Sequence, residues 1–476
     1  MTDQAAAGDG SERTAQRLTT RETAERLGVK PETVYAYVSR GQLSSNRAPG
    51  GRGSTFDAAE VDALARRTGR REPASPAGEL SFRTGITLIE GDRYCFRGVD
   101  ATELARRHTY EEIAEWLWTG ELRTGARFTA PREALAAARR TVGALPAHCG
   151  STDRLRVAVV AAAAADPLRF DLSREAVLGS ARSLIPTLVD ALPAVDADGA
   201  GGVGTAVGNG VGGGGERDEA GALDEAGERD EAGGLDEGGE RDEGGGAIAS
   251  AGSGLAHQLW PKLTARPADE ASLAVLDTAL GLLIDHDLAA STLAARVAAS
   301  ARAHPYAVVS AGLGVLEGPL HGAASGLAHR MLAEVLERGG AAPVVADHLR
   351  TGRRVPGLGH RLYAGEDPRA TALFALLADI PRAAPALAAA RDVVTTTARH
   401  TPLHANVDMA LGVLSVSSGM ASEAGETVFA ISRTAGWIAH ALEEYGERPL
   451  RMRPIGQYTG PRPPQPLPDA TGSPSQ

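Results

Sequence analysis

The stretch VPGLGHRLYAGEDPRA, residues 355–370, says most about the fold and chemistry of this chain. A Gly-x-Gly turn, which lets backbone approach a ligand closely, comes directly before His360 and its neighbour Arg361. Asp367 can cap the helix that follows, proline suits the first turn of that helix, and Arg369 then points back toward the turn. The stretch therefore gathers a titratable ring and two arginines at the start of a helix, although an ordinary surface turn is the alternative interpretation.

Two other segments have the same design. GPLHG at 318–322 puts His321 just before an apolar helical pattern, and HANVD at 404–408 puts Asp408 in the first turn of another. A histidine at a helix N-terminus feels the positive end of the helix dipole, which favours the neutral ring that can donate a hydrogen bond to an enolate oxygen. A carboxylate base needs an apolar pocket, and the sequence supplies apolar neighbours. For each residue alone, a helix-capping role is the alternative.

Two further features concern charge inside an apolar pattern. Arg433 shares one face of a predicted helix with Phe429 and Trp437, and an unpaired buried guanidinium is costly. Its anionic partner is either a substrate carboxylate or an internal acid. Asp285-His286-Asp287 interrupts another apolar pattern, and we expect no metal there, because neither an H-x-x-x-H pair nor another ligand at a fixed spacing accompanies it.

Composition predicts a large, mostly helical protein. The chain has 476 residues, 43% of them hydrophobic and only 4% aromatic, and a length prior allows about three domains. Alanine is abundant and β-branched runs are scarce, which favours helices. Cys95 and Cys149 form neither a metal pair nor a disulfide framework. With no apolar stretch of transmembrane length and no signal peptide, we expect a cytoplasmic protein without membrane contact.

The net charge of −11 comes mainly from one segment. Residues 216–243 hold 13 acidic residues and 3 arginines, within a Gly-rich, repetitive insert at about 196–252 that we predict to be a disordered loop. The other predicted parts are a disordered tail (1–12), a basic module (13–71), a linker (72–79), a helical domain (80–460) and a disordered tail (461–476). We predict helices at 100–121, 131–143, 153–165, 173–192, 268–301, 323–338, 369–380, 383–399, 407–418 and 423–445.

The basic module reads as a helix closed by a glycine, a second helix starting near Pro31, a Gly- and Arg-bearing stretch and a third helix at 57–67. This order resembles the winged helix-turn-helix domain of MerR- and excisionase-type DNA-binding proteins. That resemblance implies that the second helix enters the major groove. Contacts to DNA and a purely protein-binding role both stay open. The residues expected to reach DNA are Thr33, Tyr35, Tyr37 and Arg40, with Arg47 and Arg52 at phosphates.

The body of the chain, roughly 80–460 without the insert, resembles the citrate synthase family. The resemblance implies an all-α fold with a large domain and a small domain, about 323–433, that closes over the substrate. It rests on GIT at 85–87 with Arg97-Gly98, EEIAEWL at 111–117, DHDLAAST at 285–292, GPLHG at 318–322, the stretch from Gly357 to Arg369, NVD at 406–408, RTAGW at 433–437, and Arg453-Pro454 with Tyr458-Thr459-Gly460.

The same resemblance implies a condensation of acetyl-CoA with oxaloacetate that gives citrate and CoA, with no cofactor beyond the acyl-CoA co-substrate. Asp408 then removes a methyl proton, His321 stabilises the enol, and His360 polarises and protonates the ketone. Oxaloacetate is contacted by His286, Arg361, Arg369 and Arg433, and by Arg453 across a homodimer interface. A 2-methylcitrate synthase using propionyl-CoA is one alternative, and a DNA-binding regulator with a metabolite-sensing, synthase-like body is another.

Overall fold

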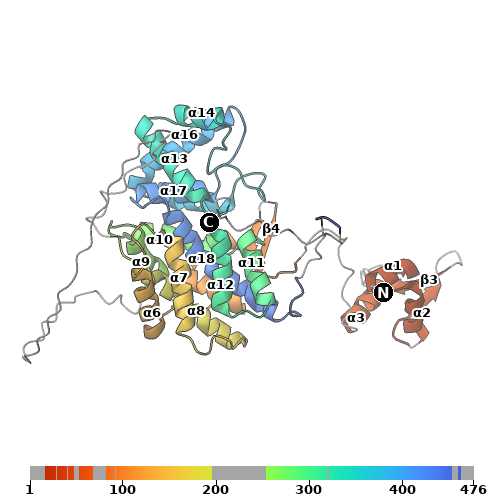
Figure 1. Ribbon diagram of the computed structural model, residues 1–476. Helices are drawn as coiled ribbons and strands as arrows, with labels where there is room; N and C mark the ends of the chain where they lie inside the picture. The colour runs from red at the N-terminus through yellow and green to blue at the C-terminus, as the bar shows by residue number, and fades with distance from the viewer. Residues whose placement is uncertain are drawn as a thin grey trace, which may run out of the picture. The chain divides into compact units, whose positions relative to one another are not determined.

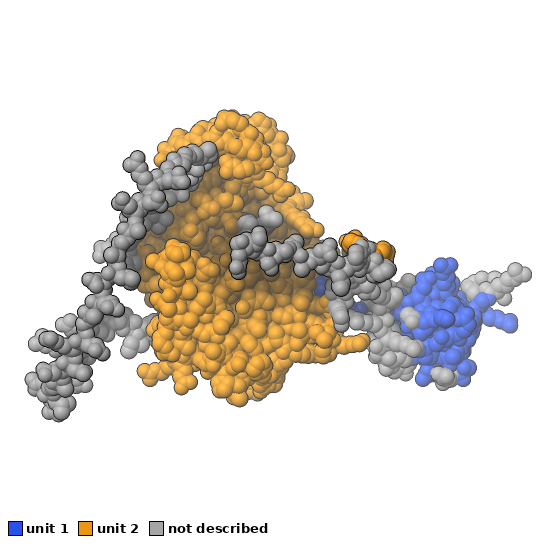
Figure 2. Space-filling model, in the orientation of Figure 1, with its two compact units in different colours: residues 1–83 blue, residues 84–476 orange. Residues whose placement is uncertain are grey.

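A computed structural model describes residues 17–27, 29–39, 41–47, 53–67, 82–91, 93–195, 254–318, 321–452 and 459–462. The chain forms two compact units, Met1–Arg83 and Thr84–Gln476, drawn in separate colours in Figure 2. The predicted linker at 72–79, the insert at about 196–252 and the N-terminal tail lie outside the described residues, as does most of the C-terminal tail.

The first unit is a three-helix module with a small antiparallel sheet of strand order β1-β3-β2 (Figure 1). Leu27, Val34, Phe56 and Val61 are almost fully buried and form its core. The predicted order of helix, helix, wing and helix is confirmed. Its elements are β1 (Arg17–Thr19), α1 (Thr20–Leu27), α2 (Pro31–Ser39), β2 (Ser45–Arg47), β3 (Ser54–Asp57) and α3 (Ala58–Arg67).

The second unit is almost entirely helical, as predicted. Its small sheet has the order β4-β5-β6, made of β4 (Thr87–Glu90), β5 (Arg93–Phe96) and β6 (Val99–Asp100). The α-helices before the insert are α4 (Ala101–Arg107), α5 (Tyr110–Thr119), α6 (Arg132–Gly143), α7 (Ser151–Ala164) and α8 (Arg174–Ala191). Those after it are α9 (Leu255–Leu263), α10 (Glu270–Leu283), α11 (Ala290–Ser300), α12 (Pro305–Leu316), α13 (Ala324–Arg338), α14 (Ala341–Arg350), α15 (Pro368–Ala378), α16 (Ala384–Ala398), α17 (Val407–Ser417) and α18 (Ala424–Tyr445), with a short 3-10 turn, η2 (Pro381–Ala383), before α16.

Two predicted helices are wrong because each is broken in the middle. The pattern at 100–121 splits into α4 and α5, because Thr109 and Glu112 form a capping box that starts a new helix. The pattern at 268–301 splits into α10 and α11 at the Asp285-His286-Asp287 turn, where Asp287 has a positive φ of 56°. Helices α9, α12 and α14 were not predicted; α12 is apolar on most sides, so periodicity gave little sign of it.

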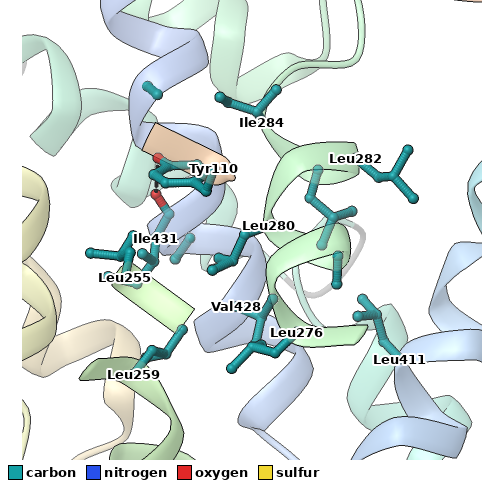
Figure 3. Packing of buried hydrophobic residues seen from close by; sticks show 14 of the residues in the cluster. Tyr110, Leu255, Leu259, Leu276, Leu280, Leu282, Ile284, Leu411, Val428 and Ile431 are labelled. Carbon is teal, nitrogen blue, oxygen red and sulfur yellow. Dashed lines mark hydrogen bonds between the residues drawn. The ribbon is translucent and has the colours of Figure 1, made fainter. Parts of the chain in front are cut away.

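Helix α18 forms the centre of the main core. It packs against α5, α8, α10, α11, α12 and α13. Figure 3 shows part of this core, where Val428 and Ile431 of α18 lie beside Leu276 and Leu280 of α10. Burying each such aliphatic side chain stabilises the fold by about 1.5–3 kcal/mol. The core therefore fixes α10 and α18 to each other, and both carry or border predicted site residues.

Helices α13, α14, α16 and α17 pack together at the end of the second unit drawn at the top of Figure 1. They fall within the predicted small domain, about 323–433, whose boundary stays a prediction. Within the described segments, no single helix has both the length and the apolar composition needed to cross a membrane. One pair of helices satisfies those criteria only when both are counted together. They are Pro368–Ala378 and Pro381–Ala398, and the chain bends by 118° between them.

Candidate active site

The turn before His360 is joined to the start of α17, which carries Asp408. Gly357 and Gly359 have φ values of 73° and 74°, the left-handed conformation that glycine adopts without strain. The amide of Asn406 donates to the carbonyl of Gly357 (2.9 Å), and its side-chain Nδ2 donates to the carbonyl of Gly359 (2.8 Å). Two of the three predicted segments thus form one structural unit, which links the turn that carries His360 to the start of the helix that carries Asp408.

His360 is a neutral hydrogen-bond donor in this structure. Its Nδ1 accepts the amide of Leu362 at 3.1 Å, so the proton of the ring is on Nε2. Burial, and then the charge of Arg369, lower the pKa of His360 to about 4. The ring centroid lies 5.0 Å from that of His286 and 4.9 Å from that of Tyr363. At neutral pH, His360 can therefore offer a proton from Nε2.

His286 lies beside it, in the turn between α10 and α11. Its side chain is 7% exposed, and Nε2 lies 2.9 Å from the hydroxyl of Tyr363. Burial, followed by the charges of Arg369 and Arg433, holds the pKa of His286 well below its usual value. Sequence reasoning missed Tyr363, since a lone tyrosine three residues after a histidine carries no signal of its own. The tyrosine orients the ring of His286.

Arg369 and Asp367 form a buried two-pronged ion pair. The distances are 2.9 Å from Nε to Oδ1 and 2.8 Å from Nη2 to Oδ2. Asp367 Oδ2 also accepts the amide of Val407 at 3.0 Å, which ties the start of α15 to the start of α17. Burial opposes ionisation, but the charge and hydrogen bonds of Arg369 outweigh it and lower the pKa of Asp367. Arg369 thus already has an internal partner, and its predicted contact with substrate stays a prediction.

Arg433 is different. It is 1% exposed, its Nε donates to the carbonyl of Leu283 at 2.8 Å, and its guanidinium lies 4.5 Å from the ring centre of Phe429. Both Nη nitrogens are buried without a hydrogen-bond partner among the described residues. Burial lowers the pKa of Arg433, against the opposing charge of Asp285. Two buried cationic donors without partners have the chemistry to bind an anion, so the predicted contact of Arg433 with a substrate carboxylate stays a prediction.

His321 also contacts Phe429, with ring centroids 6.1 Å apart in an edge-to-face arrangement. Its Nε2 is 2.8 Å from the hydroxyl of Ser291, which is fully buried at the start of α11. Burial, and then the charge of Arg433, lower the pKa of His321. The sequence predicts a neutral His321 ring because of the helix dipole. In the structure, burial and the charge of Arg433 lower its pKa instead. Ser291 was missed as a site residue, although it belongs to the DHDLAAST motif.

Asp408 is half-buried in the first turn of α17. Burial raises the pKa of its carboxyl to about 6, even though the charge of Arg369 opposes the rise. A carboxylate whose pKa approaches the working pH has the basicity that proton abstraction from carbon requires. This environment is what the sequence alone did not show for Asp408.

The remaining predicted residues are not brought into this cluster. Arg361 is exposed, and Arg453 lies outside the described residues. In the N-terminal module, Tyr35 is 49% exposed and Arg47 is exposed on β2, whereas Thr33 is half-buried. The prediction that Tyr37 reaches DNA is wrong, because its ring is 7% exposed and packs in the module's core. The other two residues predicted at DNA, Arg40 and Arg52, also lie outside the described residues.

Comparison with known proteins agrees with this geometry. The family model described as the citrate synthase C-terminal domain matches residues 76–455. The chain belongs to the citrate synthase family. A helix-turn-helix domain model matches residues 17–69, so this citrate synthase family member carries an additional N-terminal module.

Relatives and solved structures of citrate synthases extend the comparison. A citrate synthase of Haloferax volcanii is 31% identical over 403 residues, which cover 80% of this chain and 94% of that protein. Citrate synthase 2 of Bacillus subtilis is 33% identical over 44% of this chain and 56% of that protein. The citrate synthase of Acidithiobacillus ferridurans is 32% identical over 42% of this chain and 53% of that protein. The chain thus spans about half the length of these two curated relatives.

The fold is shared with the citrate synthase of Pyrobaculum aerophilum, with a TM-score of 0.59 and 22% identity over 90% of this chain and 97% of that one. It is also shared with the Thermoplasma acidophilum enzyme in its ternary complex with carboxymethyl coenzyme A and oxaloacetate, with a TM-score of 0.58 and 20% identity over 83% and 97% of the two chains. At these identities, the two structures establish the shared fold.

Proposed function

We propose that this chain catalyses the condensation of acetyl-CoA with oxaloacetate to give citrate and CoA. The observation that carries the proposal is the guanidinium of Arg433, buried with both Nη nitrogens unpartnered beside two neutral histidines. A dicarboxylate ketone supplies the missing anion, and its keto oxygen needs a hydrogen-bond donor such as His360. Membership of the citrate synthase family supports the same reaction.

The chemistry follows from the protonation states. The Asp408 carboxylate takes a proton from the methyl group of acetyl-CoA, and the electron pair of that C–H bond forms the enol carbon–carbon double bond. His321, neutral because its pKa is lowered, donates a hydrogen bond to the thioester oxygen as negative charge develops there. Both side chains are half-buried, and such interactions are stronger there than in water.

The enol carbon then attacks the ketone carbon of oxaloacetate. The ketone oxygen gains the electron pair and takes the Nε2 proton of His360, whose Nδ1 is occupied by the amide of Leu362. Arg433 holds a carboxylate, and His286, oriented by Tyr363, contacts the same molecule. Water finally attacks the thioester of citryl-CoA, which releases citrate and the CoA thiol.

The test is to incubate the purified protein with oxaloacetate and acetyl-CoA and to follow free thiol. We expect thiol release that depends on both substrates and is lost in Asp408→Asn. A folded protein that releases no thiol contradicts the proposal. Propionyl-CoA is assayed in parallel, because one methylene is worth only about 1–3 kcal/mol in a pocket and a 2-methylcitrate synthase would favour the longer acyl group.

The proposed active form is a cytoplasmic homodimer. The free thiols Cys95 and Cys149 suit a reducing compartment, and the apolar side chains of Val160, Leu168 and Phe170 stay more than 60% exposed on the single chain. Light scattering tests the dimer directly, and a monomer with full activity contradicts it. The role of Arg453 in the partner's site is tested by Arg453→Ala, which should raise the KM for oxaloacetate without dissociating the dimer.

A second function, DNA binding by the N-terminal module, is supported by the helix-turn-helix match and by the exposure of Tyr35 and Arg47. A mobility shift on genomic fragments at several salt concentrations tests it, since each phosphate contact contributes about one unit to the salt slope. We expect Arg47→Ala to reduce that slope. Binding that is unaffected by Tyr35→Ala and Arg47→Ala would exclude this surface. The two activities are compatible in one chain.

A further inference from the structure

Behind the turn that presents His286 lies a set of buried charged side chains that the mechanism above does not use. Asp285, His440 and Glu444 are fully buried, and Arg296 is 1% exposed. Glu444 accepts from Arg296 at 3.2 Å, and the guanidinium of Arg296 also reaches His440. Burying charged groups costs free energy, so we expect this arrangement to have a structural or functional role.

The protonation of His440 can be assigned from its neighbours. Its Nδ1 lies 2.9 Å from Nη1 of Arg296, and a guanidinium can only donate. Nδ1 is therefore the acceptor, the ring proton is on Nε2, and Nε2 donates to Oδ1 of Asp285 at 3.2 Å. His440 thus bridges Arg296 and Asp285 and holds the Asp285 carboxylate in place.

Asp285 is held from three further directions. Its Oδ2 accepts the hydroxyl of Thr87 at 2.5 Å, and its backbone carbonyl accepts the hydroxyl of Tyr94, also at 2.5 Å. Helix α18 approaches the turn so closely that a Cβ on Gly436 would meet the carbonyl of Ile284 at 2.1 Å. The side chain and the carbonyl of Asp285 are therefore held by hydrogen bonds, and helix α18 packs closely against the backbone of the same turn.

Asp285 also acts on Arg433. Its negative charge favours the ionised guanidinium, whose pKa burial lowers. Burial opposes the ionisation of Asp285 itself, but His440, Arg433 and Thr87 together outweigh it and lower the pKa of its carboxyl. One carboxylate therefore stabilises the charge of Arg433 and fixes the backbone of His286, the two groups that the proposed reaction assigns to the four-carbon acid.

We infer that Thr87 and His440 are positioning residues for the four-carbon acid: they hold Asp285 in one orientation, so that His286 and Arg433 are arranged before that substrate binds. The inference rests on the proposed function for the identity of the acid. It predicts a larger effect on the four-carbon acid than on the acyl-CoA, because among the described residues neither Asp408 nor His321 is hydrogen-bonded to Asp285.

The experiment uses the full chain and a pair of identical substitutions. Thr87→Val removes the hydroxyl that binds Asp285, whereas Thr278→Val removes a buried hydroxyl of α10 that donates to the carbonyl of Ala105 at 3.3 Å, outside the site. KM for oxaloacetate and for acetyl-CoA is measured by thiol release, and the Kd for oxaloacetate by calorimetry. We expect Thr87→Val to raise KM and Kd for oxaloacetate about tenfold, the size of one lost hydrogen bond to a charged group. KM for acetyl-CoA should stay within about twofold of the wild type, since no acyl-CoA contact is removed.

Thr87→Ser should restore the wild-type values, and Thr278→Val should leave both oxaloacetate constants unchanged even if it lowers the Tm. The inference is overturned if Thr87→Val lowers only the Tm, or if the two valine variants raise KM for oxaloacetate equally. If Thr87→Val does not fold, His440→Leu and His440→Gln are compared instead, because glutamine keeps an amide donor for Asp285. We then expect His440→Leu, but not His440→Gln, to raise KM and Kd for oxaloacetate.

A wild-type protein that binds oxaloacetate but releases no thiol refutes the proposed reaction, and the calorimetric comparison still decides the role of Thr87. A wild-type protein that neither binds oxaloacetate nor reacts overturns both.

Discussion

The start of α15 and the middle of α18 each bury an arginine almost completely, yet they balance its charge in opposite ways. Arg369 is 2% exposed and paired through two hydrogen bonds with Asp367. Arg433 is 1% exposed, with one hydrogen bond from Nε to a backbone carbonyl and both Nη nitrogens unpartnered. The first arginine has its hydrogen-bond partners within the folded protein, whereas both Nη nitrogens of the second have none among the described residues. This difference agrees with a structural role for Arg369 and with the proposed role of Arg433 in binding the substrate carboxylate.

The largest effect is expected at the unsatisfied arginine. Arg433→Leu should lower kcat/KM for oxaloacetate by about 10³–10⁴-fold, because a site built to hold a polar group discriminates strongly when that pairing is lost. The Tm should change little, since the substitution removes a costly buried guanidinium together with its favourable interaction with Asp285. Arg182→Leu, which removes the ion pair with Glu115 between α8 and α5, is the control and should cost stability but not KM. Unchanged activity in Arg433→Leu would remove the basis of the comparison.

The opposite result is expected at the satisfied pair. Asp367→Asn leaves Arg369 buried without its counter-charge and should lower the free energy of unfolding by about 3–5 kcal/mol. Denaturant unfolding measures this, with Asp347→Asn as the exposed control, because Asp347 pairs with Arg338 and Arg350 at the surface. We expect little change in the unfolding midpoint of the control. If Asp367→Asn is as stable as the wild type, the pair does not hold α15 to α17.

Ligand-dependent stability gives a third comparison. Oxaloacetate at about 100 times its Kd should raise the free energy of unfolding of the wild type by about 2.7 kcal/mol. Arg433→Leu should lose most of this gain, because the anion then has no guanidinium to satisfy. Thermal unfolding with and without oxaloacetate tests the prediction. An equal shift in both proteins would mean that the acid binds elsewhere.

The smallest effect concerns pH. Asp408 must be ionised to act as a base, so kcat/KM should fall about tenfold per pH unit below an apparent pKa of about 6. The charge of Asp367 raises the pKa of Asp408 and that of Arg369 lowers it. Asp367→Asn should therefore move the acid limb of a pH–rate profile to lower pH in whatever fraction remains folded. A limb that shifts upward would contradict this assignment.

The sequence predicted the type of fold and the order of most helices, because Ala-rich amphipathic patterns and Gly or Pro boundaries are local signals. It failed where tertiary contacts decide. The break between α10 and α11 depends on Thr87, Tyr94 and His440, which are far from that turn along the chain. Helix α12, buried on most sides, has no amphipathic stripe to detect.

The candidate site was predictable in part. Glycine turns and helix starts pointed to His321, His360 and Asp408, and an apolar helix face pointed to Arg433. The partners that set their protonation states, such as Tyr363 and Ser291, could not be found this way, because only folding brings them near. Tyr37 shows the reverse error: an aromatic side chain on a predicted recognition helix also has the size and polarity to complete a small core.

The main-chain join between the Gly357–Gly359 turn and Asn406 has a consequence for how such a site tolerates change. The segments of His360 and Asp408, the proposed acid and base, are linked by backbone hydrogen bonds and by the side chain of Asn406. Helices α15 and α16, which lie between them along the chain, can exchange surface residues without moving one relative to the other. If the proposed roles of His360 and Asp408 hold, the two segments can be kept as one unit while the surrounding side chains are varied to accept another acyl group.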